Sequence, residues 1–266
     1  MGLLGEALSR PGVRRALWRA WYPFFSRRIA GKGVDFLNYA FDPLDGRRPA
    51  LDPQDEPMRH NVQLYAHVVG GADLRGRRVL EVSCGHGGGA SWIVRTFRPS
   101  EYVGLDLNPE AIGHCVARHR LPGLGFVRGD AQALPFPDAS FDVVLNVEAS
   151  HCYPDFPAFV GEVARVLRPG GRFLHADLRH AGGVSEWVGA LVSRPGLRLD
   201  AMRLITPEVI RGMEAVSPRH ETLVRECLPW PLKRLGLDFA GVRGSLPHRA
   251  LLAGELDYRS FRLFRV

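Results

Sequence analysis

The chain has 266 residues, 45% of them hydrophobic, a length that suits one α/β domain with additions and leaves little room for two independent domains. The formal charge of +7 comes mostly from scattered arginines without an RNA-binding or zinc-finger motif, so nucleic acid is not predicted as a partner. No apolar run could span a bilayer and no signal-peptide pattern begins the chain, so we expect a cytoplasmic protein without stable membrane insertion.

The first predicted element is an arginine-rich segment, residues 13–29, whose apolar residues recur at helical spacing. Pro23 is expected to divide it into two short helices. A basic segment with tryptophans suits a lid or a membrane-surface helix, and a helix that covers the edge of the core is the alternative. Aromatic residues here and in the next stretch predict a water-poor pocket, with Tyr22 and Phe25 against a bulky apolar substrate, although core packing explains many of them equally well.

A helix is expected over residues 61–70, followed by a strand over 78–82. The strand leads into a loop with four glycines, in the stretch VLEVSCGHGGG at residues 79–89, and a helical pattern follows. Glycines in a strand–loop–helix unit allow backbone N–H groups to approach a nucleotide-like ligand closely.

Strand and helix then alternate in the way that specifies a parallel sheet. Further strands are predicted at residues 102–107, 124–127, 141–147 and 172–178, with helices at residues 109–120 and 156–167 between them. Residues 182–235 show helical periodicity and no clear strand, which predicts a cap over the ligand cleft. The tail at 258–266 alternates apolar residues with arginines and is expected to be a final strand.

The chain is therefore divided into an N-terminal helical cap (1–70), an α/β ligand-binding core (71–181), a helical insertion (182–235) and C-terminal strands that complete the sheet (236–266). The glycine loop alone is ambiguous, because Gly85, Gly87 and Ala90 also fit the fingerprint of a nicotinamide-dinucleotide enzyme. Acids at several predicted strand ends separate these alternatives. Glu81 lies in the first strand, Asp106 ends the second and Asp130 follows the third.

These stretches, with VGLDLNP and VLRPGG, resemble the class I S-adenosylmethionine-dependent methyltransferases over about residues 78–179. VSCGHGGGAS, NVEASHCYPDF and GELDYRSF look most like the phthiotriolone and phenolphthiotriolone dimycocerosate methyltransferases, a group of bacterial O-methyltransferases. The resemblance implies a Rossmann-like, seven-stranded, mostly parallel sheet with helices on both faces. It also implies S-adenosylmethionine as the cofactor and S-adenosylhomocysteine as its product.

In such a site, the carboxylate of Asp106 is expected to accept the ribose hydroxyls, while Asp130 accepts from the adenine amine and the Ala131 backbone donates. The remaining residues assigned to the cofactor are Tyr39, Glu81, Ser83, Cys84, Gly85, Gly87, Leu107, Asn108 and Glu148. Ser83 departs from the family pattern, because most of the superfamily has glycine there.

Methyl transfer to a hydroxyl benefits from a base, and His151 follows the carboxyl end of the strand at 141–147. It is the predicted catalytic residue, with a passive role in holding the loop or the substrate as the alternative. Glu148 is expected to orient it or to contact the cofactor, and Tyr153 to line the substrate pocket.

We therefore predict an O-methyltransferase for a polyketide, lipid or other secondary metabolite with a bulky apolar body. The alternatives are methylation of carbon or nitrogen, and a cyclase-type enzyme that binds the cofactor without transferring its methyl group. No metal is predicted, because the four cysteines form no Cys/His cluster, although Asp155 or Asp177 in principle suits a Mg²⁺ site. A homodimer is kept open.

Overall fold

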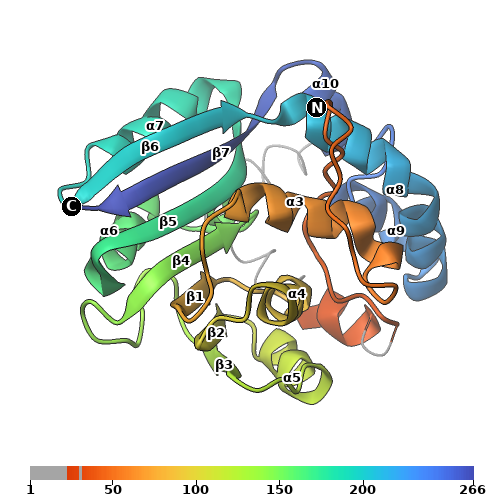
Figure 1. Cartoon of the computed structure of the whole chain (residues 1–266). Coiled ribbons are helices and arrows are strands. Elements are labelled where there is room, and N and C mark those ends of the chain that lie inside the picture. Colours follow the sequence, from red (N-terminus) through yellow and green to blue (C-terminus); the bar gives the residue numbers. More distant parts are fainter. Residues whose placement is uncertain (1–22, 30–31) are drawn as a thin grey trace.

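The computed structural model describes residues 23–29 and 32–266, and all structural statements concern these residues. A seven-stranded sheet in the order β3-β2-β1-β4-β5-β7-β6 forms its centre (Figure 1). Neighbours among β1 to β5 are parallel, whereas β7 is antiparallel to both β5 and β6. The strands are β1 (Arg78–Val82), β2 (Glu101–Asp106), β3 (Leu124–Arg128), β4 (Phe141–Val147), β5 (Leu167–His180), β6 (Leu197–Leu204) and β7 (Leu256–Arg265). The predicted seven-stranded, mostly parallel fold is confirmed.

Helices cover both faces of this sheet, because successive residues of a buried strand point to opposite sides. Val79 of β1 joins an apolar cluster with α3, α4, α8 and α10, and Leu80 joins a second cluster with α6 and α7. The helices are η1 (Glu56–Met58), α3 (Arg59–Val69), α4 (Gly88–Phe97), α5 (Pro109–Arg118), η2 (Ser150–Cys152), α6 (Phe156–Val166), η3 (Ala181–Gly183), α7 (Val184–Val192), α8 (Thr206–Cys227), α9 (Trp230–Phe239) and α10 (Leu246–Leu252). Within the described residues, none of the helices combines the length and apolarity needed to cross a membrane.

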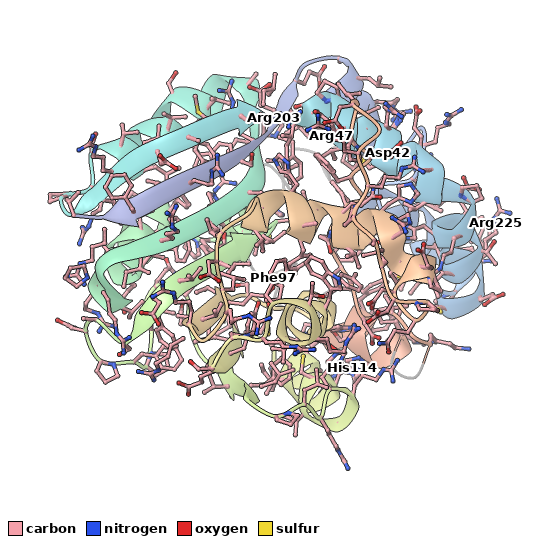
Figure 2. The ribbon with its side chains drawn as sticks, in the orientation of Figure 1. Asp42, Arg47, Phe97, His114, Arg203 and Arg225 are labelled. Carbon is pink, nitrogen blue, oxygen red and sulfur yellow. The ribbon has the colours of Figure 1, made fainter. Side chains whose placement is uncertain are left out.

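Residues 32–42, here called the strap, run across the loop that follows β1. The strap ends at Asp42, which is labelled in Figure 2. Asp42 fixes this end by pairing with Arg48 at 2.9 Å and with Arg211 of α8 at 3.0 Å. Before the strap, residues 23–29 are helical, and the residues before Pro23, which would show the predicted break, lie outside the described part of the chain. Phe25 and Ile29 pack there against α8 and the turn before α9. Tyr22 and the rest of the predicted first helix lie outside the described residues.

Two expectations for the second half are wrong. Residues 182–235 contain a strand, β6, and residues 236–266 contribute one strand together with α10 and the end of α9. β6 reads LRLDAMRL, without a β-branched or aromatic residue, and it lies at the sheet edge with most of its side chains exposed or half-buried. Its pairing with β7 makes it a strand, and that tertiary contact leaves no local sequence pattern.

Candidate active site

A cavity of about 990 Å³ opens at the carboxyl ends of β1, β2 and β4. β1 has β2 on one side and β4 on the other, so the chain order reverses between β1 and β4. Loops diverge at such a switch point and leave a crevice in which α/β proteins bind ligands. The cavity is lined by most of the residues predicted for the site: Tyr39, Ser83, Cys84, Gly85, Asp106, Leu107, Asn108, Asp130, Ala131, Glu148, His151 and Tyr153.

The loop after β1, residues 83–87 and here called the glycine loop, is locked to the end of β2. Asp106 Oδ2 accepts the backbone N–H of Gly85 at 2.9 Å, and Oδ1 accepts that of Asn108 at 2.8 Å. Burial raises the pKa of Asp106 to about 6 although these hydrogen bonds oppose the rise. The carboxylate is thus held at the cavity wall, and each oxygen keeps a second lone pair for a ligand.

Ser83 adopts a left-handed conformation with φ of 61°. This region favours glycine and costs other residues about 1 kcal/mol. Ser83 Oγ lies 2.6 Å from the hydroxyl of Tyr153, so its side chain links the glycine loop to the loop after β4.

On the β2 and β3 side, Asn108 caps α5 by accepting the Glu110 N–H at 3.1 Å. Asp130 Oδ1 accepts the backbone N–H of Gln132 at 2.9 Å, which turns the chain after β3. Both side chains therefore have local structural roles as well as positions at the cavity wall.

Glu81 and Gly87 are not among the lining residues of the cavity. The two oxygens of Glu81 accept hydrogen bonds from Tyr65 and Tyr102, both at 2.8 Å. Burial raises the pKa of Glu81 to about 7. Gly87 lies behind the loop, where a Cβ would come within 2.8 Å of the His119 ring. The geometry gives both residues a supporting place beneath the wall.

Glu148 joins the strap to the strand ends. Its oxygens accept the backbone N–H of Tyr39, each at 2.9 Å, and Oε2 accepts the hydroxyl of Tyr258 at 2.7 Å. Its own φ is 52°, so the chain bends sharply where β4 ends. Burial raises the pKa of Glu148 to about 8.

His151 is paired with the buried carboxylate of Asp177, for which the sequence suggests only a metal-binding role. His151 Nδ1 lies 2.7 Å from Asp177 Oδ1, and its backbone N–H donates to Oδ2 at 2.9 Å. Asp177 belongs to β5, the parallel neighbour of β4, so both residues come from adjacent strand ends. The position of Asp177 near the end of the predicted strand 172–178 was a signal for this pairing.

The charge on this pair is stabilised by its surroundings. Asp177 is fully buried, and this burial would raise its pKa, but His151 and Arg179 outweigh it and hold the pKa below its usual value. Burial lowers the pKa of His151, whereas Cys152 and Asp177 raise it, and the net pKa is well above the ordinary value. Ser150 also donates its hydroxyl to Asp177 at 2.6 Å.

The cavity is also lined by Leu235 and Phe239 of α9 and by Leu246 and Pro247 of α10. Phe25 lines a much smaller hollow of about 40 Å³, which shares Tyr39 and Phe239 with the large cavity. Phe25 therefore lies behind the cavity wall and does not line the large cavity, where we expected it to contact the substrate. Tyr22, for which we expected the same contact, lies outside the described residues.

A family model described as "Methyltransferase domain" matches residues 80–175. Together with the relative described next, this match and the sheet order identify an S-adenosylmethionine-dependent methyltransferase of the class I fold. The chain is 48% identical over 259 residues to the phthiotriol/phenolphthiotriol dimycocerosates methyltransferase of Mycobacterium tuberculosis, covering 97% of this chain and 95% of that protein. It belongs to the methyltransferase family that includes this mycobacterial enzyme.

Two further comparisons extend this result. A fatty-acid O-methyltransferase of Mycolicibacterium smegmatis is 50% identical over 208 residues, which cover 78% of this chain and 76% of that protein. The crystal structure of the [4+2]-cyclase SpnF superposes with a TM-score of 0.71 at 20% identity and covers 92% of this chain and 94% of that one. The likeness to the cyclase concerns the fold alone.

Proposed function

We propose that the protein methylates a hydroxyl group of a bulky, lipid-like molecule, with His151 as general base and Asp177 as its positioning residue. The observation that carries this proposal is the 2.7 Å contact between His151 Nδ1 and Asp177 at the edge of the cavity that contains the glycine loop. The names of the relatives, which concern dimycocerosates and fatty acids, support a lipid acceptor.

S-adenosylmethionine, when bound, supplies an electrophilic methyl group on a positively charged sulfur. In the proposal, Asp106 accepts the ribose hydroxyls, and Asp130 with the Ala131 backbone N–H binds the adenine edge. Ser83, Cys84 and Gly85 provide the wall for the methionine part, with Tyr39, Leu107, Asn108 and Glu148 around it. Glu81 and Gly87 act from behind, since the first holds Tyr65 and Tyr102 and the second allows close packing.

The charge of the cavity suits this donor. Its described lining includes four aspartates, Asp35, Asp106, Asp130 and Asp238, and Glu148, whose raised pKa keeps it largely protonated at pH 7, against the basic residues Arg128 and His151. A negative lining attracts a cationic donor and disfavours an anionic acceptor. We therefore assign the acceptor group to a neutral hydroxyl, with the apolar body of the acceptor against Leu235, Phe239 and Leu246.

His151 completes the chemistry. Asp177 holds Nδ1, so Nε2 is the ring nitrogen that takes the proton from the acceptor hydroxyl. The buried carboxylate then stabilises the imidazolium that forms. A base of this kind contributes about 10²–10⁴-fold, and alignment of the two substrates supplies the rest.

The test is incubation with methyl-labelled S-adenosylmethionine and matched long-chain substrates, one ending in a secondary alcohol and one in a carboxylate. We expect labelled methyl ether from the alcohol, with one S-adenosylhomocysteine released per ether formed. Labelled ester from the carboxylate alone would contradict the assignment. Turnover of a substrate without S-adenosylhomocysteine release would favour the cyclase-type alternative. Labelled methyl on a carbon or nitrogen atom of the product would favour the alternative of C- or N-methylation.

A further inference from the structure

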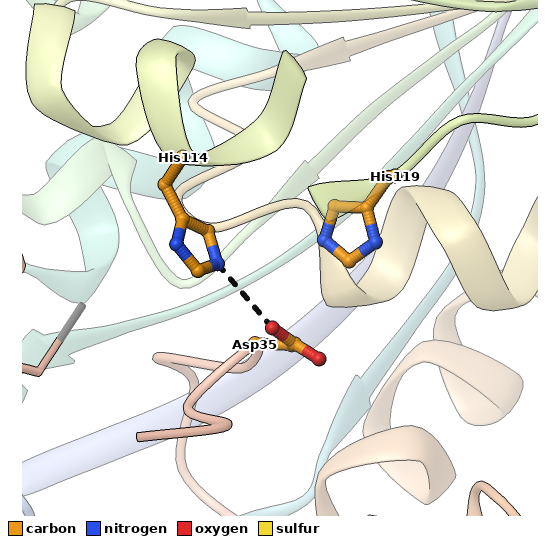
Figure 3. Close-up of side chains that lie close together, drawn as sticks. All are labelled: Asp35, His114 and His119. Carbon is orange, nitrogen blue, oxygen red and sulfur yellow. Dashed lines mark hydrogen bonds and ion pairs between the residues drawn. The ribbon is translucent and has the colours of Figure 1, made fainter. Parts of the chain in front are cut away.

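Three side chains that can bind a metal ion meet beside the cavity, where the strap passes α5 (Figure 3), and one of them, Asp35, also lines the cavity. Asp35 comes from the strap, His114 from α5 and His119 from just beyond the end of α5. One donor atom of each lies within 4.8 Å of those of the other two, and His114 Nε2 is 3.3 Å from Asp35 Oδ1. No other such group occurs among the described side chains.

We propose that Asp35, His114 and His119 bind a divalent ion of the zinc type, which fastens the strap over the glycine loop. Two imidazoles and one carboxylate form a ligand set that zinc and its late first-row neighbours prefer, whereas Mg²⁺ and Ca²⁺ prefer oxygen ligands. Three protein ligands leave the fourth position of a tetrahedral site to water.

The geometry requires only small adjustments. Three atoms no more than 4.8 Å apart share a centre within about 2.8 Å of each atom, and Zn–N and Zn–O bonds measure about 2.0–2.2 Å. Side-chain shifts of less than about 1 Å therefore bring the three ligands to bonding distance. Because all three groups are already gathered, little conformational entropy has to be lost on binding.

Packing holds the two imidazole rings in place. The His114 ring lies 4.7 Å from the ring of His86, and the His119 ring lies against Gly87, where a Cβ would approach it to 2.8 Å. His119 Nε2 also makes a 2.8 Å hydrogen bond to the carbonyl oxygen of His86. A metal ion on Nδ1 would keep this bond, and an ion on Nε2 would replace it.

The ion would connect α5 with the strap, which touches the start of α4 directly after the glycine loop. The carbonyl oxygen of Asp35 accepts the N–H of Gly88 at 2.9 Å, and a Cβ on Gly88 would lie only 2.5 Å from that oxygen. The strap also forms part of the cavity wall through Phe36, Leu37 and Tyr39. Fixing Asp35 to α5 would therefore restrict movement of the wall and slow the release of a bound cofactor.

One cation competes with the proposed ion. Arg118 lies 3.3 Å from Asp35 Oδ2, and its side chain is 58% exposed, so it can turn away into solvent. Replacing Arg118 removes the competing charge without touching a ligand. The proposal thus predicts that His114→Gln weakens metal binding and that Arg118→Gln strengthens it. A general loss of folding would not produce opposite effects at two neighbouring positions.

The binding test uses the full chain without an affinity tag, titrated with Zn²⁺ by calorimetry and with Co²⁺ by visible absorption. We expect one ion per chain in wild type. Asp35→Asn and His114→Gln should each weaken binding by more than about 100-fold, because even groups that only support metal ligands typically contribute 10–100-fold. Arg118→Gln should tighten binding by about three- to ten-fold. His180→Gln, at an exposed position, is the control and should bind as wild type.

Wild type without one-to-one binding at micromolar Zn²⁺ would overturn the proposal, as would His114→Gln with unchanged affinity or Arg118→Gln with weakened affinity. A second measurement follows S-adenosylhomocysteine dissociation with Zn²⁺ and with a chelator. Slower dissociation with Zn²⁺, and only with the three ligands intact, is expected. An equal dissociation rate with Zn²⁺ and with the chelator would contradict the fastening role. Failure of S-adenosylhomocysteine to bind at all would instead count against the proposed function.

Discussion

The hydroxyls of Ser83 and Tyr153 lie 2.6 Å apart, so one hydrogen bond joins the glycine loop to the loop that carries His151. Asn146 donates to the same Tyr153 oxygen at 2.9 Å. Ser83 keeps this contact in a left-handed conformation that glycine would adopt without strain. Ser83 therefore keeps a strained backbone conformation, and its hydroxyl makes a hydrogen bond that glycine could not make between the two loops of the site.

A double-mutant cycle on Ser83 and Tyr153 separates the free energy of the backbone strain from that of the hydrogen bond. In wild type, Ser83→Gly should change the free energy of unfolding by less than about 0.5 kcal/mol, because relief of strain offsets the lost hydrogen bond. In Tyr153→Phe the bond is already absent, so the same substitution should stabilise the protein by about 1 kcal/mol. Urea unfolding measures both values, and equal effects in the two backgrounds would show that the contact contributes nothing.

His175 should make stability depend on pH. It is fully buried among aromatic rings, and burial lowers its pKa to about 4. An unfolded histidine takes up its proton near pH 6.5, so the stability associated with neutral His175 is present above pH 6.5 and lost as pH falls towards 4. The full difference amounts to about 3 kcal/mol.

His175→Phe removes this titration, since phenylalanine carries no proton. We expect the difference in unfolding free energy between this variant and wild type to shift in favour of the variant as pH falls from 7 to 5. Acids with raised pKa values, such as Glu81 and Asp106, titrate in both proteins. Their contributions therefore cancel in the difference between the unfolding free energies of the variant and wild type. A difference that stays constant with pH would contradict the buried neutral histidine.

Cofactor binding should release a proton from Glu148. Burial raises its pKa to about 8, so it is largely protonated in the free protein at pH 7, and a nearby cation favours the ionised form. The affinity for S-adenosylmethionine should therefore rise by at least about ten-fold between pH 6 and pH 8. Glu148→Gln should flatten this dependence. Calorimetry in buffers of different ionisation enthalpy counts the proton directly, and no release at pH 7 in wild type would contradict the prediction.

The parallel core and most of the cavity lining follow from local sequence signals. The bounds predicted for β1 and β4 agree with the structure, because both strands are buried apolar runs followed by loops. Ser83, Asp106 and His151 follow or end predicted strands, and the parallel sheet brings those ends together.

The features that the sequence did not reveal depend on contacts between distant segments. β6 exists through its pairing with β7, and Glu81 is turned from the cavity by Tyr65 and Tyr102. Asp35 and His114 are 79 residues apart in the chain and meet only because the strap crosses α5. Periodicity and motif spacing carry no information about such meetings.

The pH dependence of catalysis tests the partnership of His151 and Asp177. The base must be neutral, so kcat/KM should rise with pH through the pKa of His151, which Cys152 and Asp177 hold above its ordinary value. Asp177→Asn removes the negative charge at 2.7 Å and should move this inflection to lower pH. It should also lower the plateau, because the imidazolium loses its stabilising partner. An unchanged inflection would show that Asp177 does not influence the pKa of the group that controls the rate.

Single-turnover methyl transfer by His151→Asn, at saturating S-adenosylmethionine and acceptor, tests the central claim most directly. The rate should fall by about 10²–10⁴-fold relative to wild type, while calorimetry gives an S-adenosylmethionine affinity within about three-fold. The variant should also lose the rise of rate with pH. A single-turnover rate within about three-fold of wild type, at equal cofactor occupancy, would contradict the assignment of His151 as the general base.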